Sequence, residues 1–158
     1  MVGRIEQAFP GLRGTAYQVT SPQDDKYNCI AWAAGDTTDW WWPDEADNPD
    51  SAYWPPGAPR AETLEAFRLA FATLGYVVCD HDHIEVGYEK IALFSQAGVP
   101  KHAARQLLSG RWTSKLGPME DIEHALHDLT GMMCGSVVLV MKRLFPAAAG
   151  EEAASEGG

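Results

Sequence analysis

The stretch "KIALFSQAGVPKHAARQLLSGRWTSKLG", residues 90–117, decides the fold expected of this chain. It holds three short runs with strand character, at residues 90–95, 102–107 and 111–115, separated by the turn-forming "AGVPK" and "LSG". Connections this short cannot carry a crossover, so the runs predict an antiparallel meander. The apolar run "SVVLVMKRL" predicts a buried final strand at residues 136–143.

Helices are predicted before and after this meander in the sequence. Residues 29–34 read as a short helix, because Asn28 is a good N-cap and Gly35 a good stop. "AETLEAFRLAFATLG", residues 61–75, has one apolar stripe at spacings of three and four, and "PMEDIEHALHDLTG", residues 118–131, has another. Residues 1–28 look irregular and residues 36–60 form a long connection. The fold class expected is therefore α+β, with N-terminal helices packed on a central antiparallel sheet.

Composition bounds the function. The 158 residues carry a net charge of -10, which repels phosphate backbones, so we expect no nucleic-acid partner. No apolar run is long enough for a membrane span and none resembles a signal peptide, so a cytoplasmic protein without a membrane partner is expected. The three cysteines are then free thiols. Residues 1–146 are expected to form a single domain and residues 147–158 a disordered acidic tail. The oligomeric state stays open.

Two residues have the character of a catalytic pair. Cys29 lies at the predicted first turn of a helix, where the amide dipoles favour the reactive thiolate. His102 begins a predicted strand and could serve as the imidazole that such a nucleophile needs. The alternative is that Cys29, next to Ile30 and Ala31, is an unreactive core residue.

The motifs "YNCIAWAAG" and "HAARQLLSGRWTSKLG" resemble those of the papain-like superfamily, nearest its NlpC/P60 and CHAP branches. Most of the chain, residues 8–145, also resembles a family of small uncharacterised bacterial proteins described as a domain of unknown function. The matching features are "YNCIAWA", "WWWP", "KIALF", "RWTSKLG", "DIEH" and "MKR". The papain-like resemblance implies a single papain-like domain that acts as a thiol hydrolase on a peptide or amide substrate.

That resemblance also implies a third residue that orients the imidazole. In the NlpC/P60 pattern it lies on the strand after the histidine, which here offers Ser114, with Thr113 beside it. Asp121 or Glu120 could substitute from the following predicted helix, although a charge in a first helical turn explains both acids.

The oxyanion of such a reaction needs hydrogen-bond donors. The helix start makes the backbone amide of Cys29 available, and Tyr27 or Gln23 could add a side-chain donor. Gln23 lies six residues before Cys29, a spacing similar to that of the papain glutamine.

Tryptophans cluster after the candidate nucleophile, at Trp40, Trp41, Trp42 and Trp54. Three consecutive side chains cannot share one face of a strand or helix, so at least one is expected to line a surface or groove. They form either a substrate-binding wall for a peptide, sugar or cation, or the packed interior of a long loop.

Two clusters have metal-ligand residue types. Cys79, His81 and His83 alternate and would share one face of a strand. Glu120, His124 and His127 would lie on the polar face of the predicted helix. Neither has the full spacing of a known metal motif, so no metal and no other cofactor is assigned.

Two functions are thus open. The first is a thiol hydrolase, a peptidase or amidase, whose Cys-His pair would serve equally for transfer to an amine or for deamidation. The second is a non-catalytic module on the same fold that binds a protein or ligand in a tryptophan-lined groove. The expected partner in both is a peptide or protein.

Deletion of residues 147–158 should leave the melting temperature nearly unchanged, because these residues are small, acidic and without a large apolar anchor. Thermal unfolding of the full-length and shortened chains tests this. A drop of several degrees in the shortened chain would show that the tail packs on the domain.

Overall fold

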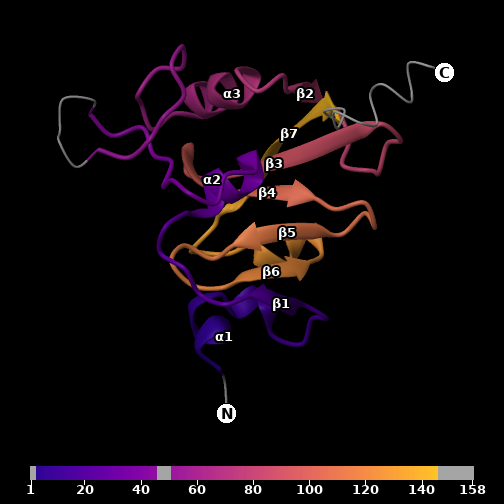
Figure 1. The fold of residues 1–158 in the computed structure, drawn as a ribbon. Coiled ribbons are helices and arrows are strands. Elements are labelled where there is room, and N and C mark those ends of the chain that lie inside the picture. The colour runs from indigo at the N-terminus through magenta and orange to yellow at the C-terminus, as the bar shows by residue number, and fades with distance from the viewer. Residues whose placement is uncertain (1–2, 46–50, 146–158) are drawn as a thin grey trace.

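A computed structural model describes residues 3–45 and 51–145, so the predicted tail lies outside the described residues. Its centre is one seven-stranded sheet in the order β1-β6-β5-β4-β3-β7-β2 (Figure 1), and every neighbouring pair is antiparallel. The strands are β1 (Gln18–Ser21), β2 (Val77–Cys79), β3 (Tyr88–Gln96), β4 (Val99–Gln106), β5 (Trp112–Lys115), β6 (Asp121–His124) and β7 (Ser136–Leu144).

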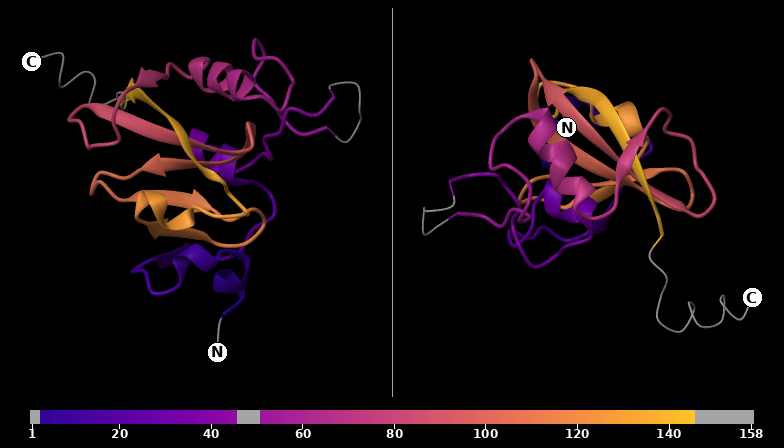
Figure 2. Two further views of the ribbon diagram at one scale, coloured as in Figure 1. Left: turned by 180° about the vertical axis from the view of Figure 1, so that it is seen from behind. Right: turned by 90° about the horizontal axis from the view of Figure 1, so that it is seen from above.

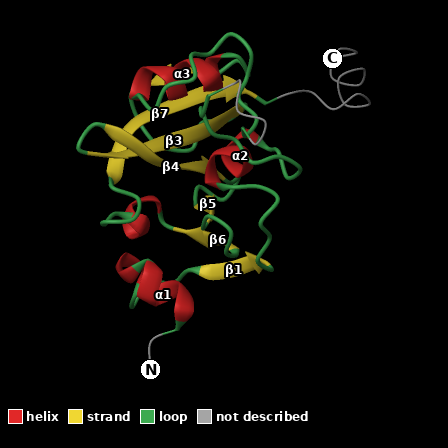
Figure 3. Ribbon diagram, turned by 90° about the vertical axis from the view of Figure 1, so that its left-hand side faces the viewer, coloured by secondary structure: helices red, strands yellow, loops and turns green. Residues whose placement is uncertain are grey.

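The helices are short. They are α1 (Arg4–Ala8), α2 (Cys29–Ala34) and α3 (Leu64–Ala72), with 3-10 helices η1 (Pro10–Leu12) and η2 (Leu126–Leu129). Figure 3 shows that α2 lies by β4 and β5, whereas α1 lies near β1. In the left-hand view of Figure 2, α1 and α3 lie at opposite ends of the molecule. The longest described helix of the chain, α3, has 9 residues, and no described helix has the length and apolar character needed to cross a membrane.

The predicted meander is confirmed. β3 and β4 join through Ala97 and Gly98, which both have positive φ, as a two-residue type I′ hairpin requires. β4, β5 and β6 follow as successive antiparallel neighbours, and β7 pairs with the other edge of β3. The hydrophobic runs therefore predicted β3, β4, β5 and β7 correctly, whereas β6 was not predicted.

The inner strands of the sheet, β3 to β6, are largely buried, and β3 is covered on both faces. Alternate residues of β3 enter different cores: Ile91 and Leu93 pack in one, Ala92 and Phe94 in the other. The first core includes α2, α3 and the loop that carries Trp41 and Trp54. The second core includes α1, η1 and η2. This placement explains why β3 reads as a continuous apolar run rather than an alternating one.

The expected fold class was wrong. The structure is a β-rich fold built on a seven-stranded antiparallel sheet, rather than a papain-like α+β domain with N-terminal helices on its sheet. Two of the helices expected, α2 and α3, are present and begin at the side-chain caps Asn28 and Thr63. The region before them, expected to be irregular, contains α1 and the edge strand β1.

The helix predicted at residues 118–131 was also wrong. This segment forms strand β6 and then η2. Its residues have good helix propensity, but β6 gains two neighbours, β1 and β5, and buries Asp121, Ile122 and His124. Tertiary pairing thus overrides local propensity here.

Two glycines with positive φ differ in the space around them. An added Cβ at Gly135 would lie 2.1 Å from the carbonyl oxygen of Ser95, whereas Gly110 has nothing within 4 Å. Gly110→Ala should cost about 1 kcal/mol of unfolding free energy from left-handed strain alone. Gly135→Ala should cost about 2 kcal/mol more, because the backbone must also shift. Urea unfolding of both variants measures the difference, and equal losses would contradict the close approach.

Candidate functional site

Cys29 is the first residue of α2 and is buried. The Asn28 side chain caps the helix by accepting from the Ala31 amide and also donates to the Trp41 carbonyl, which holds the turn against the following loop. Burial raises the pKa of the Cys29 thiol to about 11. The backbone amides of Ala103, Ile30 and Cys29 and the charge of Lys115 act in the opposite direction, but burial outweighs them. The thiol is therefore protonated at neutral pH.

Cys29 and His102 line one pocket of about 230 Å³. His102 comes from β4, at the end of the sheet where α2 packs on β4 and β5. Cys134 lines the same pocket, and its own burial raises the pKa of its thiol to about 12. Within the described ranges, no hydrogen bond joins the Cys29 sulfur to the His102 ring.

A chain of hydrogen bonds extends from His102 into the sheet. His102 Nε2 lies 2.9 Å from Ser114 Oγ, and Ser114 Oγ lies 2.7 Å from His124 Nε2. His124 Nδ1 is 2.7 Å from the carbonyl oxygen of Ala125. These side chains come from β4, β5 and β6 in succession, and Ser114 and His124 are fully buried.

The direction of this chain follows from its last bond. A carbonyl oxygen only accepts, so His124 Nδ1 carries a proton and donates to Ala125. In the neutral ring His124 Nε2 is then an acceptor, so the Ser114 hydroxyl donates to it. Ser114 Oγ in turn accepts from a protonated His102 Nε2. The Nδ1 atom of a neutral His102 is therefore unprotonated and can accept a proton.

Both imidazoles are neutral at physiological pH, as this assignment requires. Burial lowers the pKa of His102 to about 3, and His124 adds to the effect. Burial also lowers the pKa of His124 below its ordinary value, against the hydrogen bond to Ala125 and the charge of Asp128. The arrangement thus leaves an unprotonated ring nitrogen, in a fixed tautomer, on a residue that lines the same pocket as Cys29.

Of the predicted triad members, Ser114 contacts His102 and Asp121 does not. Asp121 is fully buried and accepts hydrogen bonds from the hydroxyls of Thr20 and Tyr27. The Tyr27 hydroxyl is 3.0 Å from Asp121 Oδ2, so this donor is engaged away from the position predicted for an oxyanion. Gln23 is exposed and lines a neighbouring hollow with Pro118 and Met119, two residues that also line the thiol pocket.

Lys115 is a buried cation behind the site. Its ammonium donates to the carbonyl oxygens of Asp24 and Gly117 and lies 4.7 Å from the centre of the Tyr27 ring. Burial lowers the pKa of this amine, while the acidic groups nearby and the Cys29 sulfur oppose the shift. The interaction with Cys29 makes Lys115 the closest source of positive charge that acts on the thiol.

The tryptophans lie mainly inside the first core. Trp41 and Trp54 are buried, at 5% and 3% exposure, and Trp42 packs edge-on against Phe67. The indole nitrogens of Trp41 and Trp54 donate to Asp36 and to the Pro59 carbonyl. Trp40 is half-buried, and none of the four lines the pocket of Cys29. Trp41 and Trp54 therefore share a core with Cys29, but they do not form a wall of the pocket that Cys29 lines.

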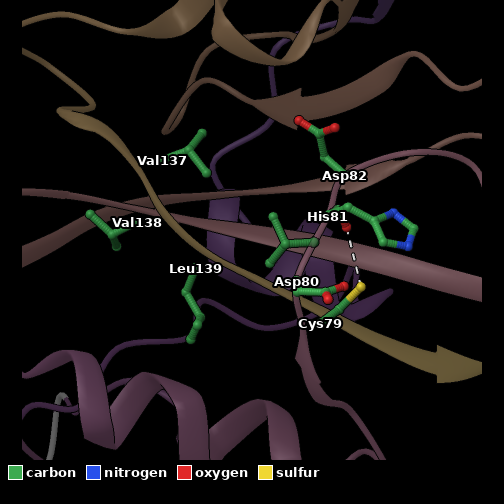
Figure 4. Close-up of a pocket in the computed structure, with 8 residues that line it drawn as sticks. Cys79, Asp80, His81, Asp82, Val137, Val138 and Leu139 are labelled. Carbon is green, nitrogen blue, oxygen red and sulfur yellow. Dashed lines mark hydrogen bonds between the residues drawn. The ribbon is translucent and has the colours of Figure 1, made fainter.

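A separate hollow lies at the loop after β2, where Figure 4 shows Cys79, Asp80, His81 and Asp82 opposite residues of β7. Ligand atoms of Cys79, His81 and Glu85 lie within 4.8 Å of one another, which suits a metal ion. The buried ammonium of Lys90 already lies among them, 3.2 Å from His81 Nδ1 and 3.3 Å from Glu85 Oε1. A metal ion at this place would have to displace a cation that is fully hydrogen-bonded.

Fold and site together define a β-rich domain whose sheet carries a thiol-imidazole pocket at one end. The chain belongs to the family described as Domain of unknown function (DUF7689), whose model matches residues 18–142. This range includes Cys29, His102, Ser114 and His124. Searches of the curated proteins and of the solved structures found no match.

Sequence reasoning missed His124, Lys115 and Cys134 as parts of the site. His124 was placed on the polar face of a helix, although Gly117-Pro118 before it is a turn signal between two possible strands. A hairpin at that turn would have placed His124 on the strand next to Ser114, as β5 and β6 pair. Lys115 and Cys134 carry no local signal, because only the fold brings them to the pocket.

The neutral buried histidines predict a specific pH dependence. Unfolded His102 binds a proton below its ordinary pKa of 6.5, whereas the folded ring stays neutral down to about pH 3. The stability that this difference provides is complete above pH 6.5 and is lost as the pH falls, at up to about 1.4 kcal/mol per pH unit. His102→Gln should therefore flatten the fall in unfolding free energy between pH 6 and pH 4.

Urea unfolding at each pH measures this slope. His127→Gln is the matched control, because the His127 side chain is 68% exposed. Its unfolding free energy should fall with pH at the same slope as that of the parent protein. Identical slopes for the parent and His102→Gln would show that His102 is charged in the folded state.

Proposed function

We propose that this protein is a thiol hydrolase that cleaves a peptide or amide bond, with Cys29 as nucleophile and His102 as general base. The observation that carries the proposal is the Ala125–His124–Ser114–His102 hydrogen-bond chain. It leaves the Nδ1 atom of His102 unprotonated, in the pocket that Cys29 also lines. An orienting partner on Nε2 and a free Nδ1 are what an imidazole base needs.

In the first half-reaction, His102 Nδ1 takes the proton of the Cys29 thiol while the sulfur attacks the carbonyl carbon of the substrate. The resulting oxyanion accepts a hydrogen bond from the Cys29 backbone amide. The imidazolium then gives its proton to the leaving amine, and a thioester on Cys29 remains. In the second half-reaction, His102 takes a proton from water and the hydroxide attacks the thioester carbonyl. The carboxylic acid leaves, and the imidazolium returns its proton to the displaced Cys29 thiolate. An amine in place of water gives transfer.

The resting charges favour one order of events. With a thiol pKa of about 11 and an imidazole pKa of about 3, the resting pair is neutral rather than a thiolate and an imidazolium. Proton transfer therefore accompanies the attack. The ammonium of Lys115 and the amides around the sulfur stabilise the negative charge as it develops.

A second candidate is a non-catalytic module that holds a ligand in the same pocket. The absence of a hydrogen bond between Cys29 and His102 within the described residues favours it, as does the protonated state of the thiol. The two candidates differ in whether a covalent intermediate forms on Cys29.

An activated acyl ester, p-nitrophenyl butyrate, distinguishes them. The hydrolase should release p-nitrophenol in a burst and gain the mass of one butyryl group on Cys29, located by peptide mapping. Cys29→Ala should abolish the acylation, and His102→Gln should slow it about 100-fold through loss of the base. Cys79→Ala is the matched thiol control and should react like the parent protein.

Ser114→Ala provides an intermediate case. It removes the orienting hydroxyl but keeps the base, so acylation should slow less than in His102→Gln. Equal rates of Cys29 acylation in the parent protein, Ser114→Ala and His102→Gln would show that the hydrogen-bond chain has no part in the mechanism. If the protein is folded and Cys29 is never acylated, the second candidate, the non-catalytic binding module, is correct.

A further inference from the structure

The walls of the thiol pocket are apolar. Beyond Cys29, His102 and Cys134, the lining comes from the end of α1, the β5–β6 turn and the segment before β7: Ala8, Phe9, Leu116, Pro118, Met119 and Met133. Lys101 is the one lining residue with a charged side chain, and it is exposed. The ammonium group of Lys101 therefore has access to solvent, and the interior of the pocket offers mainly carbon and sulfur surface.

Apart from Lys101 on the solvent side, the polar side chains of the site are engaged with one another and are not free to bind a polar side chain of the substrate. The ring nitrogens of His124, the Ser114 hydroxyl and His102 Nε2 are all engaged with one another or with Ala125. A polar or charged group in the pocket would lose its water without gaining partners, which disfavours binding. His102 Nδ1 remains available, and the proposed reaction uses it.

The volume limits the size of the ligand. About 230 Å³ is below the range of drug-sized pockets. A water molecule, with its one non-hydrogen atom, takes ~30 Å³ in the liquid. By that measure the pocket has room for about eight non-hydrogen atoms. Met119 and Met133 border this space, and the flexible methionine side chain adapts to apolar groups of different shape.

We propose that the acyl part of the substrate is apolar and of medium size, such as a leucine- or phenylalanine-like side chain or a linear acyl chain of about six carbons. This inference rests on the proposed function, since it assigns the substrate class of the same site. Met133 is a specificity residue at the mouth, because it lines the pocket and is 57% exposed.

A series of p-nitrophenyl esters tests the inference: acetyl, butyryl, hexanoyl and succinyl. Each buried methylene should raise the acylation rate constant kcat/KM by about fourfold, so hexanoyl should exceed acetyl by at least about tenfold if two or more of its four additional methylenes are buried. The succinyl ester matches butyryl in length but carries a carboxylate, and it should react at least tenfold more slowly. Release of p-nitrophenol gives the rates, and intact mass gives the site.

Two neighbouring methionines form a matched pair for this test. Met133→Glu puts a charge at the mouth of the pocket and should remove most of the preference for hexanoyl over acetyl. Met132→Glu changes an 85% exposed neighbour that does not line the pocket, and it should keep the preference. Both positions are exposed, so both variants should fold.

The outcomes separate this inference from the proposed function. Acylation of Cys29 at similar rates by all four esters would overturn the apolar preference and leave the hydrolase intact. A faster succinyl ester would overturn it in favour of an acidic substrate bound by Lys101. Loss of the preference in both glutamate variants would remove Met133 from its role. If no ester acylates Cys29, the proposed function and this inference both fail.

Discussion

Buried imidazoles and hydroxyls must have hydrogen-bond partners, and in this protein that requirement ties three strands together at one end of the sheet. His102, Ser114 and His124 lie on consecutive strands. In the hydrogen-bond chain that they form, each donor faces an acceptor of the next side chain. β4 and β5 share ladder pairs only at Arg105–Thr113 and Gln106–Trp112. Beyond that ladder, the side-chain bond from His102 to Ser114 connects the two strands. α2, which begins at Cys29, packs on β4 and β5, the two strands that this bond joins.

The second constraint is that the inner strands of the sheet are largely buried and that β3 is covered on both faces. A strand such as β3, which sends Leu93 to one core and Phe94 to the other, needs cover on each side. The chain supplies it with short helices and an aromatic loop rather than with long helices. The tryptophans suit this task, because each fills a large volume and its indole nitrogen finds an acceptor, as Trp54 does at the Pro59 carbonyl. The apolar pocket lies beside α1 and the β5–β6 turn.

Much of the fold could be predicted from local signals, and the errors have identifiable causes. The β3–β4 hairpin, α2 with its Asn28 cap and α3 with its apolar stripe are encoded within a few residues each. Residues 118–131 were mistaken for a helix because propensity and periodicity favour one there, whereas pairing with β1 and β5 decides the outcome. β1 was missed because its four residues are largely exposed and have no apolar pattern.

The candidate site was predictable in part for the same reason. Cys29 has a local signature, the start of a helix. His102 was predicted at the start of a strand but is the fourth residue of β4, and Ser114 follows from the strand after it. His124 depends on the correct assignment of β6, and Cys134 and Lys115 depend on how distant segments pack. Asp121 has the right chemistry for a triad, but its strand directs it to Thr20 and Tyr27. Residue type alone could not separate these two carboxylate roles.

The two outermost strands of the sheet bear on how the protein behaves in concentrated solution. An edge strand exposes unpaired amide and carbonyl groups, which invite pairing with other molecules and lead to fibrous aggregates. Here both edge strands are short, β1 with 4 residues and β2 with 3, and β1 is further interrupted by a bulge between Val19 and Ser21. Such short, irregular borders give a neighbouring molecule little to extend. The long strands β3, β4 and β7, which would propagate a sheet readily, are all interior.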